Sequence, residues 1–493
     1  MSMIQVENLT YRYPGSSEAV FENLSFQLDS RWKLGLIGRN GRGKTTLMRL
    51  LTGECDAGCA IHTAVQFEYF PRTVSDPQRP AMEALREICP AAEEWELVCE
   101  LSKLGLEGDV LEQPFSTLSG GEQTRSLLAA MFLNEGRFLL IDEPTNHLDA
   151  AGRARMADYL RRKRGFILAS HDRALLDGCV DHILSINRTG IEVQAGNYSS
   201  WQLNFDRQQA FEQARDAQLR RDIGRMREAA RQSADWSDRV EATKGVRVAG
   251  LKPDKGRIGH KAAKLMQRSK SIEARREQAI EEKAALLKNA EKSEPLKLSP
   301  LSYHAQRLLE LRDVRIHYDG REICGPLTLE LALMQGERVC LEGRNGSGKS
   351  SLLRLILGED VPHEGRIQLA SGLIVSYVAQ SAAQLWGSLS DFARERGVDG
   401  TLLRTILRKL GFERAQFERD MAEFSQGQRK KALIAASLCQ RAQLYLWDEP
   451  LNYIDIDSRI QIEALLREAQ PTMLFVEHDA AFQRAVATRT LRL

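Results

Sequence analysis

Two stretches decide the fold of this chain: GRNGRGKT at residues 38–45 and GRNGSGKS at residues 343–350. Each follows a short apolar run and opens a helical pattern. The glycines let successive backbone N–H groups close around an anion, and a helix N-terminus favours negative charge. The lysine near the end of each stretch suits nucleotide phosphates, and the hydroxyl after it suits Mg²⁺. The sequence therefore predicts two phosphate loops.

The loops belong to a longer repeat. Four landmarks recur in the same order at offsets of 305 to 307 residues, namely the loop lysines, two later serines, two aspartates and two histidines (Lys44/Lys349, Ser119/Ser425, Asp142/Asp448 and His171/His478). One such match could arise by chance, but four in register indicate two copies of one nucleotide-binding domain.

Composition narrows the class of protein. The 493 residues are 43% hydrophobic and 28% charged, which fits a soluble chain of two or three domains. No apolar run approaches the roughly 20 residues that span a bilayer, and the N-terminus shows no signal-peptide pattern. The eight cysteines are scattered without metal-like spacing. We expect a cytoplasmic protein with reduced thiols.

Short apolar runs alternate with helical stretches in both halves. Buried strands are predicted at 33–37, 138–141, 166–169 and 182–186, and again at 338–341, 444–447 and 473–476. Helices are predicted at 44–51, 81–88, 91–103 and 122–133. This alternation predicts an α/β fold with a parallel sheet wrapped by helices, present twice. The expected domains are 1–198, a helical linker at 199–300, and 301–493.

The linker has a different composition. It is rich in Arg, Gln, Glu and Ala, has no proline between residues 199 and 252, and turns at glycines and a proline within 245–259. This pattern predicts a long antiparallel helical hairpin. Residues 239–270 hold ten Lys/Arg and two acids, a charge of +8 on a chain of net charge +2, so the rest carries −6. A passive spacer remains an alternative, but the isolated basic block favours an anionic partner.

Two acids end one strand in each half. Asp142 and Glu143 close the first, and Asp448 and Glu449 the second. The carboxyl edge of a parallel sheet is where such folds bind ligand. The first acid of each pair is predicted to hold the Mg²⁺ shell, and the second to polarise the attacking water.

The remaining motifs resemble those of ATP-binding cassette (ABC) proteins. LSGGEQ at 118–123 is similar to the family's signature, and FSQGQ at 424–428 is a variant of it. The resemblance implies ATP hydrolysis with ATP and Mg²⁺ as cofactors, and switch histidines at His171 and His478. It also implies D-loops at Asp149 and Asp455, a Q-loop at Gln380, and adenine stacking on Tyr13 and Tyr318.

The resemblance also implies head-to-tail pairing of the two domains within a monomer, so that Lys44 would pair with Ser425 and Lys349 with Ser119. The residues expected to bind ATP are Tyr13, Gly38, Asn40, Gly41, Gly43, Lys44, Thr45, Thr46, Ser119, Gly121, Tyr318, Gly343, Asn345, Gly346, Gly348, Lys349, Ser350, Ser351, Gln380, Ser425 and Gly427. Those expected at Mg²⁺ are Thr45, Asp142, Ser350, Gln380 and Asp448.

Two positions depart from the family pattern. Arg72 stands where the first Q-loop glutamine is expected, and Gln426 replaces a signature glycine. Both belong to the composite site of Lys44, so the two sites are expected to be unequal.

Three classes of cassette protein are candidates for the function of this chain. A transporter ATPase would not need a basic helical hairpin between its cassettes, and DNA-repair or iron–sulphur ATPases would need cysteine clusters. The long linker, with GNYS at 196–199 and EPTNHLD at 143–149, resembles the ribosome-binding ABC-F class. That class implies the 70S ribosome, with its 23S rRNA and P-site tRNA, as partner, and neither a membrane subunit nor DNA.

Within ABC-F, the chain resembles the antibiotic-resistance members of the Lsa and Vga kind. The residues that carry this are DEPLNYID at 448–455, DKGRIGHKAAK at 254–264 and RSK at 268–270. The short spans 72–119 and 380–425 leave no room for the arm insertion of housekeeping factors, and no C-terminal extension follows His478. The resemblance implies entry into the ribosomal E site and displacement of lincosamides, pleuromutilins or streptogramin A. A housekeeping translation factor is the alternative.

The candidate RNA contacts are the basic residues of the linker, listed here in order: Arg239, Lys244, Arg247, Lys252, Lys255, Arg257, Lys261, Lys264, Arg268 and Lys270. Between them, residues 246–251 (VRVAGL) are mostly apolar and small. They suit either insertion into an RNA pocket or a hydrophobic cap on the hairpin, and the sequence leaves both open.

Overall fold

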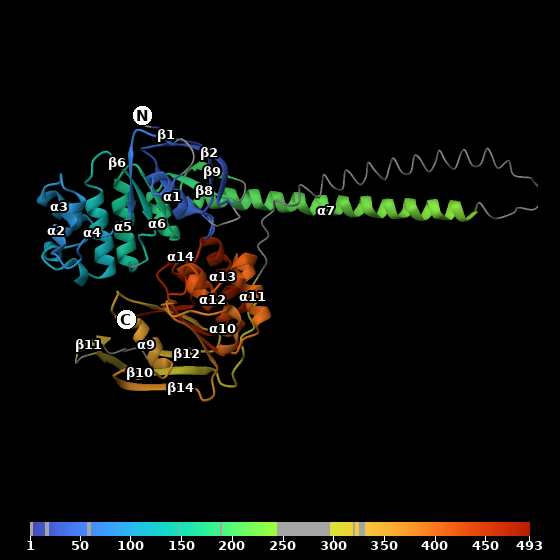
Figure 1. Cartoon of the computed structure of the whole chain (residues 1–493). Coiled ribbons are helices and arrows are strands. Elements are labelled where there is room, and N and C mark those ends of the chain that lie inside the picture. Colours follow the sequence, from blue (N-terminus) through green and yellow to red (C-terminus); the bar gives the residue numbers. More distant parts are fainter. Residues whose placement is uncertain are drawn as a thin grey trace, which may run out of the picture. The chain divides into compact units, whose positions relative to one another are not determined.

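The computed structural model describes residues 3–14, 19–56, 61–146, 148–187, 190–243, 296–318, 321–324 and 331–493. By contacts the chain divides into two units. One combines Met1–Trp201 with Glu294–Leu493, and the other is Gln202–Ser293. The first unit therefore contains both halves of the sequence repeat, which are called here the N-terminal half (up to residue 201) and the C-terminal half (from residue 296) (Figure 1).

The N-terminal half contains a six-stranded sheet in the order β5-β6-β7-β3-β8-β9. Its strands are β3 (Lys33–Ile37), β5 (Gln66–Phe70), β6 (Arg137–Asp142), β7 (Phe166–Ala169), β8 (His182–Ile186) and β9 (Ile191–Ala195). All neighbouring pairs are parallel except β8 with β9. The chain crosses over through helices because parallel strands cannot be joined by a tight turn.

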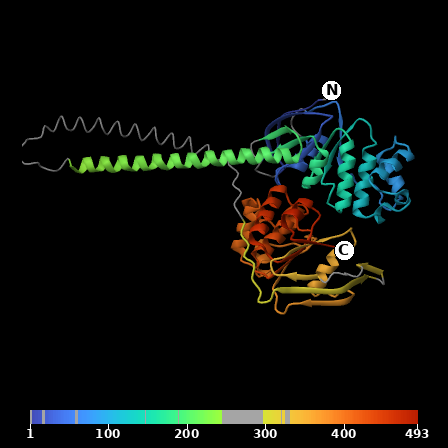
Figure 2. The ribbon, with the colours of Figure 1, turned by 180° about the vertical axis from the view of Figure 1, so that it is seen from behind.

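A smaller antiparallel sheet in the order β2-β1-β4 accompanies it. Its strands are β1 (Met3–Tyr11), β2 (Phe21–Asp29) and β4 (Ile61–His62). The helices of this half are α1 (Lys44–Thr52), α2 (Ala81–Ile88), α3 (Glu94–Lys103), α4 (Gly120–Met131), α5 (Ala150–Arg162) and α6 (Arg173–Cys179). Figure 2 shows the same elements from behind.

Two apolar clusters cover opposite faces of the six-stranded sheet. Alternate residues of β6 contribute to different clusters: Leu139 and Ile141 pack with α2 to α6, whereas Phe138 and Leu140 pack with α1 and the antiparallel sheet. Strands buried on both faces read as continuous apolar runs, which is why the sequence revealed them.

The C-terminal half repeats this plan. Its parallel sheet has the order β15-β16-β17-β13-β18, and its antiparallel sheet has β10 paired with β11, β12 and β14. The strands are β10 (Arg307–Tyr318), β11 (Arg321–Cys324), β12 (Leu331–Met334), β13 (Arg338–Glu342), β14 (His363–Leu369), β15 (Val375–Val378), β16 (Leu444–Asp448), β17 (Met473–Val476) and β18 (Arg489–Arg492). The helices are α9 (Lys349–Ile356), α10 (Leu389–Glu395), α11 (Gly400–Lys409), α12 (Gln426–Cys439), α13 (Ile456–Ala469) and α14 (Ala480–Val486).

These sheets confirm the predicted α/β fold in both halves. Two predicted helices had wrong ends. The helix predicted at 91–103 begins at Glu94, because Glu93 forms a capping box with Glu96. The helix predicted at 122–133 is α4, which begins at Gly120 and ends at Met131.

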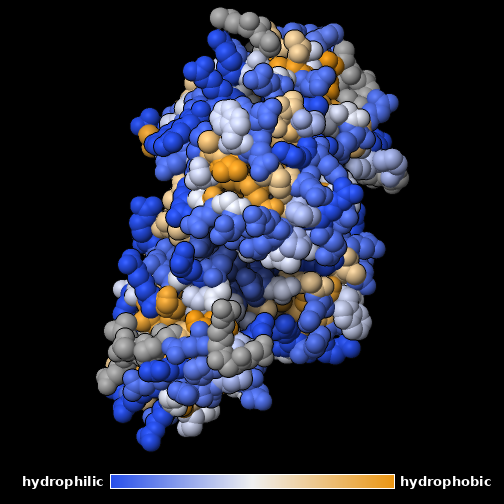
Figure 3. All heavy atoms as spheres, turned by 90° about the vertical axis from the view of Figure 1, so that its left-hand side faces the viewer, coloured by the Kyte–Doolittle hydropathy of each residue, from blue (hydrophilic) through white to orange (hydrophobic). Residues whose placement is uncertain are grey.

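The two halves contact each other through helices that follow matching strands. Helix α6 packs against α14, and Ile456 of α13 belongs to the apolar cluster of the N-terminal half. The face of the molecule in Figure 3 is mainly hydrophilic, with its apolar residues in small separate patches.

Helix α7 (Tyr198–Thr243) continues from the N-terminal half. Its first turn is fixed by a hydrogen bond from Ser199 N to Asp177 Oδ1 at 2.7 Å, and Tyr198 is buried there. With 46 residues the helix measures about 69 Å at 1.5 Å per residue. The predicted turn and return helix of the hairpin, at residues 244–295, lie outside the described residues.

Candidate functional site

Both phosphate loops connect a central strand to a helix, as the sequence predicted. Lys44 Nζ donates to Gly38 O at 2.6 Å, and Lys349 Nζ donates to the carbonyls of Gly343 and Arg344 at 2.9 and 2.8 Å. Each ammonium therefore lies inside the curve of its own loop. Burial lowers the pKa of both lysines.

Glycine is required at the residue before each loop helix. Gly43 and Gly348 have φ of 85° and 84°, in the left-handed region. A Cβ on Gly43 would lie 2.6 Å from Val20 Cγ1 and 2.7 Å from Phe21 Cζ. Only glycine allows this backbone to turn so tightly beside β2.

The acid pairs lie next to the loops. Thr45 Oγ1 donates to Asp142 Oδ2 at 2.7 Å, and Ser350 forms the matching hydrogen bond with Asp448. The next residue in each pair, Glu143 or Glu449, has φ of 49° or 43°, which is uncommon outside glycine. Hydrogen bonds from their backbone N–H groups to Ala169 O and Val476 O hold this conformation.

The two signature segments begin helices. Ser119 caps α4, and its partner in a capping box is Glu122. Ser425 caps α12 in the same way with Gln428. The first N–H groups of both helices thus lie beside the serine that the sequence predicted for phosphate binding.

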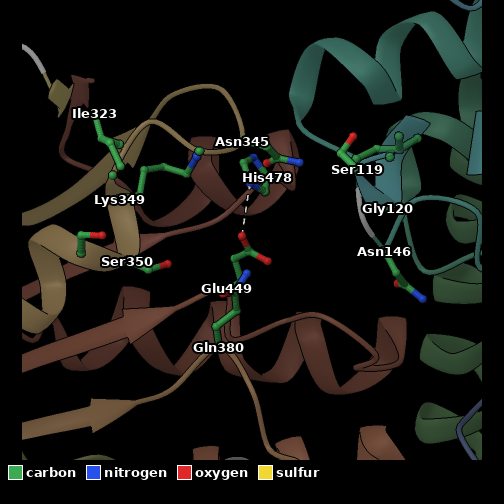
Figure 4. Close-up of a pocket in the computed structure, with 15 residues that line it drawn as sticks. Ser119, Gly120, Asn146, Ile323, Asn345, Lys349, Ser350, Gln380, Glu449 and His478 are labelled. Carbon is green, nitrogen blue, oxygen red and sulfur yellow. Dashed lines mark ion pairs between the residues drawn. The ribbon is translucent and has the colours of Figure 1, made fainter. Parts of the chain in front are cut away.

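A cavity of about 430 Å³ lies between the first signature and the second phosphate loop. Its lining includes Ser119, Gly121 and Asn146 from the N-terminal half and Lys349, Ser350, Gln380, Glu449 and His478 from the C-terminal half. Figure 4 shows Ser119, Gly120 and Asn146 on one side and Lys349, Asn345 and Glu449 on the other. Lys349 and Ser119 therefore share one composite site, called here the Lys349 site.

The other composite site, the Lys44 site, pairs the first phosphate loop with the C-terminal half. Asn40 Nδ2 donates to Tyr453 O at 2.9 Å. A Cβ on Gly427 would lie 2.7 Å from Asn40 Nδ2, so the second signature lies against this loop. A cavity of about 70 Å³ nearby is lined by both halves, including Asn40 and Asp455.

The pKa values of the two candidate bases are shifted in opposite directions. Burial, helped by the charge of Asp142, raises the pKa of Glu143 to about 7. Burial would also raise the pKa of Glu449, but its contacts with His478, Gln380 and Asn452 lower it to about 2. Asn452 Nδ2 donates to Glu449 Oε2 at 2.7 Å, whereas Glu143 Oε1 is buried without a hydrogen-bond partner in the described chain.

The switch histidines are placed alike. His171 Nε2 lies 3.5 Å from Glu143 Oε1 and 3.2 Å from Asn40 Oδ1. His478 Nε2 lies 3.5 Å from Glu449 Oε1 (Figure 4). Burial, followed by the charge of Lys44, lowers the pKa of His171 well below its usual range.

The Q-loop positions differ as the sequence indicated. Gln380 lines the Lys349 site and contacts Glu449. Arg72 instead donates from Nη1 to Glu68 Oε1 at 2.9 Å, and Glu68 is only 6% exposed. The arginine thus pairs with a buried acid of β5, the strand that ends two residues before it.

The predicted adenine-stacking tyrosines differ in their contacts. The Tyr13 hydroxyl lies 2.7 Å from Thr46 Oγ1 on α1, directly beside the first phosphate loop. Tyr318 is 36% exposed, and it is Ile323 that lines the cavity of the Lys349 site. Among the predicted D-loop residues, Asp149 caps α5, and Asp455 caps α13 and pairs with Lys431 at 2.5 Å.

Sequence reasoning missed Lys430, which is 2% exposed. Its Nζ donates to Ala379 O, Gln380 O and Asp448 O at 2.7, 2.9 and 3.3 Å, so it ties the signature helix to the Q-loop. The corresponding residue of the first half is Thr124, which bonds only within its own helix in the described contacts. A lysine in an otherwise apolar helical face was the available signal.

The candidate RNA contacts cannot be placed. Arg239 is on α7, but its side chain lies outside the described residues, as do Lys244, Arg247, Lys252, Lys255, Arg257, Lys261, Lys264, Arg268 and Lys270.

The comparison with protein families decides the identity of both halves. The model of the ABC transporter family matches residues 21–146 and 327–452. The chain belongs to this family. Its halves are ATP-binding cassettes and the protein is an ATPase; the halves are called the first and second cassette below.

Among curated relatives, the chain is 29% identical to the probable ATP-binding protein YheS of Escherichia coli K12, over 94% of this chain and 75% of YheS. It is 28% identical to the ATP-binding protein Uup of Caulobacter vibrioides, over 98% and 76% of the two chains. It is 27% identical to the ribosome protection protein VmlR of Bacillus subtilis, over 97% and 84%.

Among solved structures, the archaeal ribosome recycling factor aABCE1, in complex with the stalk protein aP1, superposes with a TM-score of 0.64. The alignment covers 98% of this chain and 87% of aABCE1 at 19% identity, so it supports the fold alone.

The cassette sites offer ligands that suit Mg²⁺. Each has a hydroxyl and a carboxylate oxygen side by side at the end of a phosphate loop, and hard oxygen ligands are what this ion prefers. Asp448 Oδ1 is buried without a hydrogen-bond partner in the described contacts, so this oxygen is available to bind a cation. Within the described ranges, no group of three or more His, Cys, Asp or Glu residues is arranged so that it could hold a metal ion by itself. In the same ranges we find no helix with the length and apolarity needed to cross a bilayer.

We expect the double change Glu143→Gln and Glu449→Gln to preserve ATP binding and to lower hydrolysis by at least about a hundredfold, because both candidate bases are removed. Phosphate release and binding of a fluorescent ATP analogue measure the two effects. The control is Glu135→Gln with Glu423→Gln, two exposed acids outside both sites. Phosphate release near the wild-type rate would reject the assignment of both glutamates.

We expect Gln380→Ala to lower the ATPase rate about tenfold, because it removes a hydrogen bond to a charged carboxylate at the Lys349 site. Arg72→Ala should change the rate less than about twofold, since that side chain faces Glu68. Steady-state hydrolysis of the two variants checks this. Equal losses would contradict the structural difference between the two Q-loop positions.

Proposed function

We propose that this ATPase is a ribosome-binding protein of the ABC-F class and of the resistance type, acting in the cytoplasm. It would enter the E site of the 70S ribosome and use the linker at residues 199–300 near the P-site tRNA and the peptidyl-transferase centre. There it would displace lincosamide, pleuromutilin or streptogramin A drugs.

The observation that carries the proposal is helix α7. Its first turn is fixed by contacts of Tyr198 and Ser199, and the helix spans 46 residues of the sequence that separates the two cassettes. In sequence it leads into the basic segment 239–270, with its charge of +8. A long polar helix that delivers positive charge suits a partner lined with phosphate.

The roles proposed for the site residues follow their positions. Lys44 and Lys349 would bind the β- and γ-phosphates, and Thr45 with Asp142 and Ser350 with Asp448 and Gln380 would hold Mg²⁺. Glu143 and Glu449 would orient the attacking water, next to His171 and His478. Ser119 and Gly121 would complete the Lys349 site, and Ser425 and Gly427 the Lys44 site.

The match to VmlR supports the resistance type, because that relative is named for ribosome protection and is covered over 84% of its length. The short spans after both Q-loop positions give the same support: only α2 and α3 with two short 3-10 turns separate β5 from the first signature. This leaves the span without an inserted arm.

Sequence identity does not decide between the resistance type and the housekeeping alternative. The identity to YheS, 29%, is no lower than the 27% to VmlR, so overall similarity does not favour the resistance relative. An ATPase subunit of a membrane transporter is less well supported, because α7 would have no obvious role there.

Co-sedimentation with 70S ribosomes tests the shared part of the proposal. The Glu143→Gln, Glu449→Gln protein should pellet with ribosomes in ATP and remain in the supernatant in ADP. Nucleotide-independent or absent binding would overturn the ribosomal function. Drug susceptibility of a sensitive bacterial host then separates the two ABC-F alternatives.

Ribosome binding should weaken with salt, since phosphate contacts release counterions. Changing Arg257, Lys261, Lys264 and Lys270 to Gln should make the plot of log binding constant against log salt concentration less steep. On duplex DNA the slope of this plot is about −0.9 per phosphate contact. Co-sedimentation between low and high salt measures the slope. An unchanged slope would assign the phosphate contacts to the cassettes instead.

The apolar residues of the segment 246–251 should matter for drug protection alone. Val246, Val248 and Leu251 carry no side-chain hydrogen-bonding group, so any effect they have must come from shape. Changing them to Ala should preserve ATPase activity and ribosome binding but shift the inhibitory concentration of lincosamides or pleuromutilins at least about fourfold. Absence of protection by the wild type would reject the resistance type and favour the housekeeping factor.

A further inference from the structure

One face of α13 joins the second cassette to the first. Four of its residues contact the first cassette, and they are called the seam: Ile456, Asp457, Ile460 and Glu463. Their spacing places them along one side of the helix. The seam contains two apolar contacts and two ion pairs.

The ion pairs reach different parts of the first cassette. Asp457 Oδ2 lies 3.0 Å from Nε of Arg39, which belongs to the first phosphate loop. Glu463 pairs with Arg173 at the start of α6, and Arg173 also lies 3.4 Å from Asp479. The side chains of Arg173 and Glu463 are only 13% and 12% exposed, so this pair is less screened than a surface contact.

The apolar contacts extend a hydrophobic core across the interface. Ile456 is 8% exposed and belongs to the same cluster as residues of α5 and α6, and Ile460 packs against that cluster. Truncating either side chain would expose apolar area that the two cassettes now share.

The first cassette has no counterpart of the seam. Asp149 and Asp455 cap α5 and α13 in the same way, and Arg153 and Arg459 follow four residues later. In this register the four seam positions correspond to alanines: Ala150, Ala151, Ala154 and Ala157. The first three of these are exposed.

Arg173, the ion-pair partner of Glu463, also has no counterpart in the other cassette. Arg173 follows Asp172, the cap of α6, and the residue that follows Asp479, the cap of α14, is Ala480. Since α5 carries Ala157 where α13 carries Glu463, the ion pair cannot form a second time on the opposite side of the molecule.

The seam is connected to the Lys44 site through the second D-loop. Arg459 binds Asp479 at 3.0 Å and donates to the carbonyls of Leu451 and Ile454. Between those two carbonyls lies Tyr453, whose own carbonyl accepts the hydrogen bond from Asn40. Arg173, the seam's partner, lies 3.4 Å from the same Asp479 carboxylate, so the seam's ion pair and the D-loop share this residue.

We propose that the seam keeps the two cassettes joined at the Lys44 site during the ATPase cycle, so that nucleotide exchanges mainly at the Lys349 site. Arg173 and the seam residues are positioning residues, which act through the D-loop and touch no nucleotide. This inference concerns the ATP sites of the cassette pair and does not depend on the ribosomal function.

The test replaces the seam by the residues of the first cassette: Ile456→Ala, Asp457→Ala, Ile460→Ala and Glu463→Ala. Alanine favours helix, and α5 carries the same four alanines, so we expect α13 to fold. Release of fluorescent N-methylanthraniloyl-ADP is measured by stopped flow in two backgrounds. Lys349→Ala confines the label to the Lys44 site, and Lys44→Ala confines it to the Lys349 site.

We expect the alanine seam to speed release from the Lys44 site at least about tenfold, the usual scale for losing a shielded charge pair at an interface. Release from the Lys349 site should change less than about twofold. Arg173→Gln should act in the same direction, and Glu468→Ala, an exposed change on α13, should change neither rate. Equal acceleration at both sites, or none at the Lys44 site, would overturn the proposal.

The converse experiment introduces the seam residues into the first cassette and Arg173's counterpart into the second. Ala150→Ile, Ala151→Asp, Ala154→Ile, Ala157→Glu and Ala480→Arg build a second seam on α5 and α14. Release from the Lys349 site should then slow at least about threefold, with the Lys44 site unchanged. A properly folded transplant that leaves the Lys349 rate unchanged would also count against the seam as the cause of asymmetry.

Discussion

The cavity that contains Lys349 and Ser119 is lined by both cassettes, so neither cassette forms it alone, and the rest of the structure depends on this constraint. The N–H groups that open a signature helix belong to one half, and the lysine that faces them belongs to the other. Because both halves are in one chain, the partner is always present at high effective concentration, and pairing needs no second molecule. Head-to-tail contact therefore follows from the duplication revealed by Lys44 and Lys349.

In the first cassette, the arginine that stands in place of the Q-loop glutamine is paired with a buried acid close to it. Glu68 is 6% exposed, and a buried acid without a partner would be costly. Arg72 and Asn134 both bind it. At the corresponding places the second cassette has Ser376, which bonds to Ser437, and Gln380, which contacts Glu449. The loss of a Q-loop glutamine thus came with a buried acid that holds its replacement away from the site.

The sequence was sufficient to predict features that depend on neighbouring residues or on the internal repeat. The strands at 33–37, 166–169 and 182–186 match β3, β7 and β8 in full, because strands buried on both faces are uninterrupted apolar runs. The pairing of Lys349 with Ser119 came from the family resemblance, and the cavity agrees with it. The antiparallel sheets went unpredicted, since half-exposed strands such as β14 lack such runs.

What the sequence could not reveal depends on contacts between distant residues. Arg173 and Glu463 are 290 residues apart, and nothing near either one indicates the other. The opposite pKa shifts of Glu143 and Glu449 likewise follow from neighbours that only the fold assembles. A single clue was present: comparing α5 with α13 position by position shows four alanines against two isoleucines and two acids.

Three differences between the cassettes concern the Lys44 site: its Q-loop glutamine is absent, Gln426 replaces a signature glycine, and the seam is connected to it. The Lys349 site keeps Gln380 and the signature glycines. The concentration of these differences at one site fits a division of labour in which one interface holds the cassettes together and the other turns over ATP. Under the proposed ribosomal function, this arrangement would keep the linker aligned on its partner, because opening at one site only would turn the cassettes about a fixed contact.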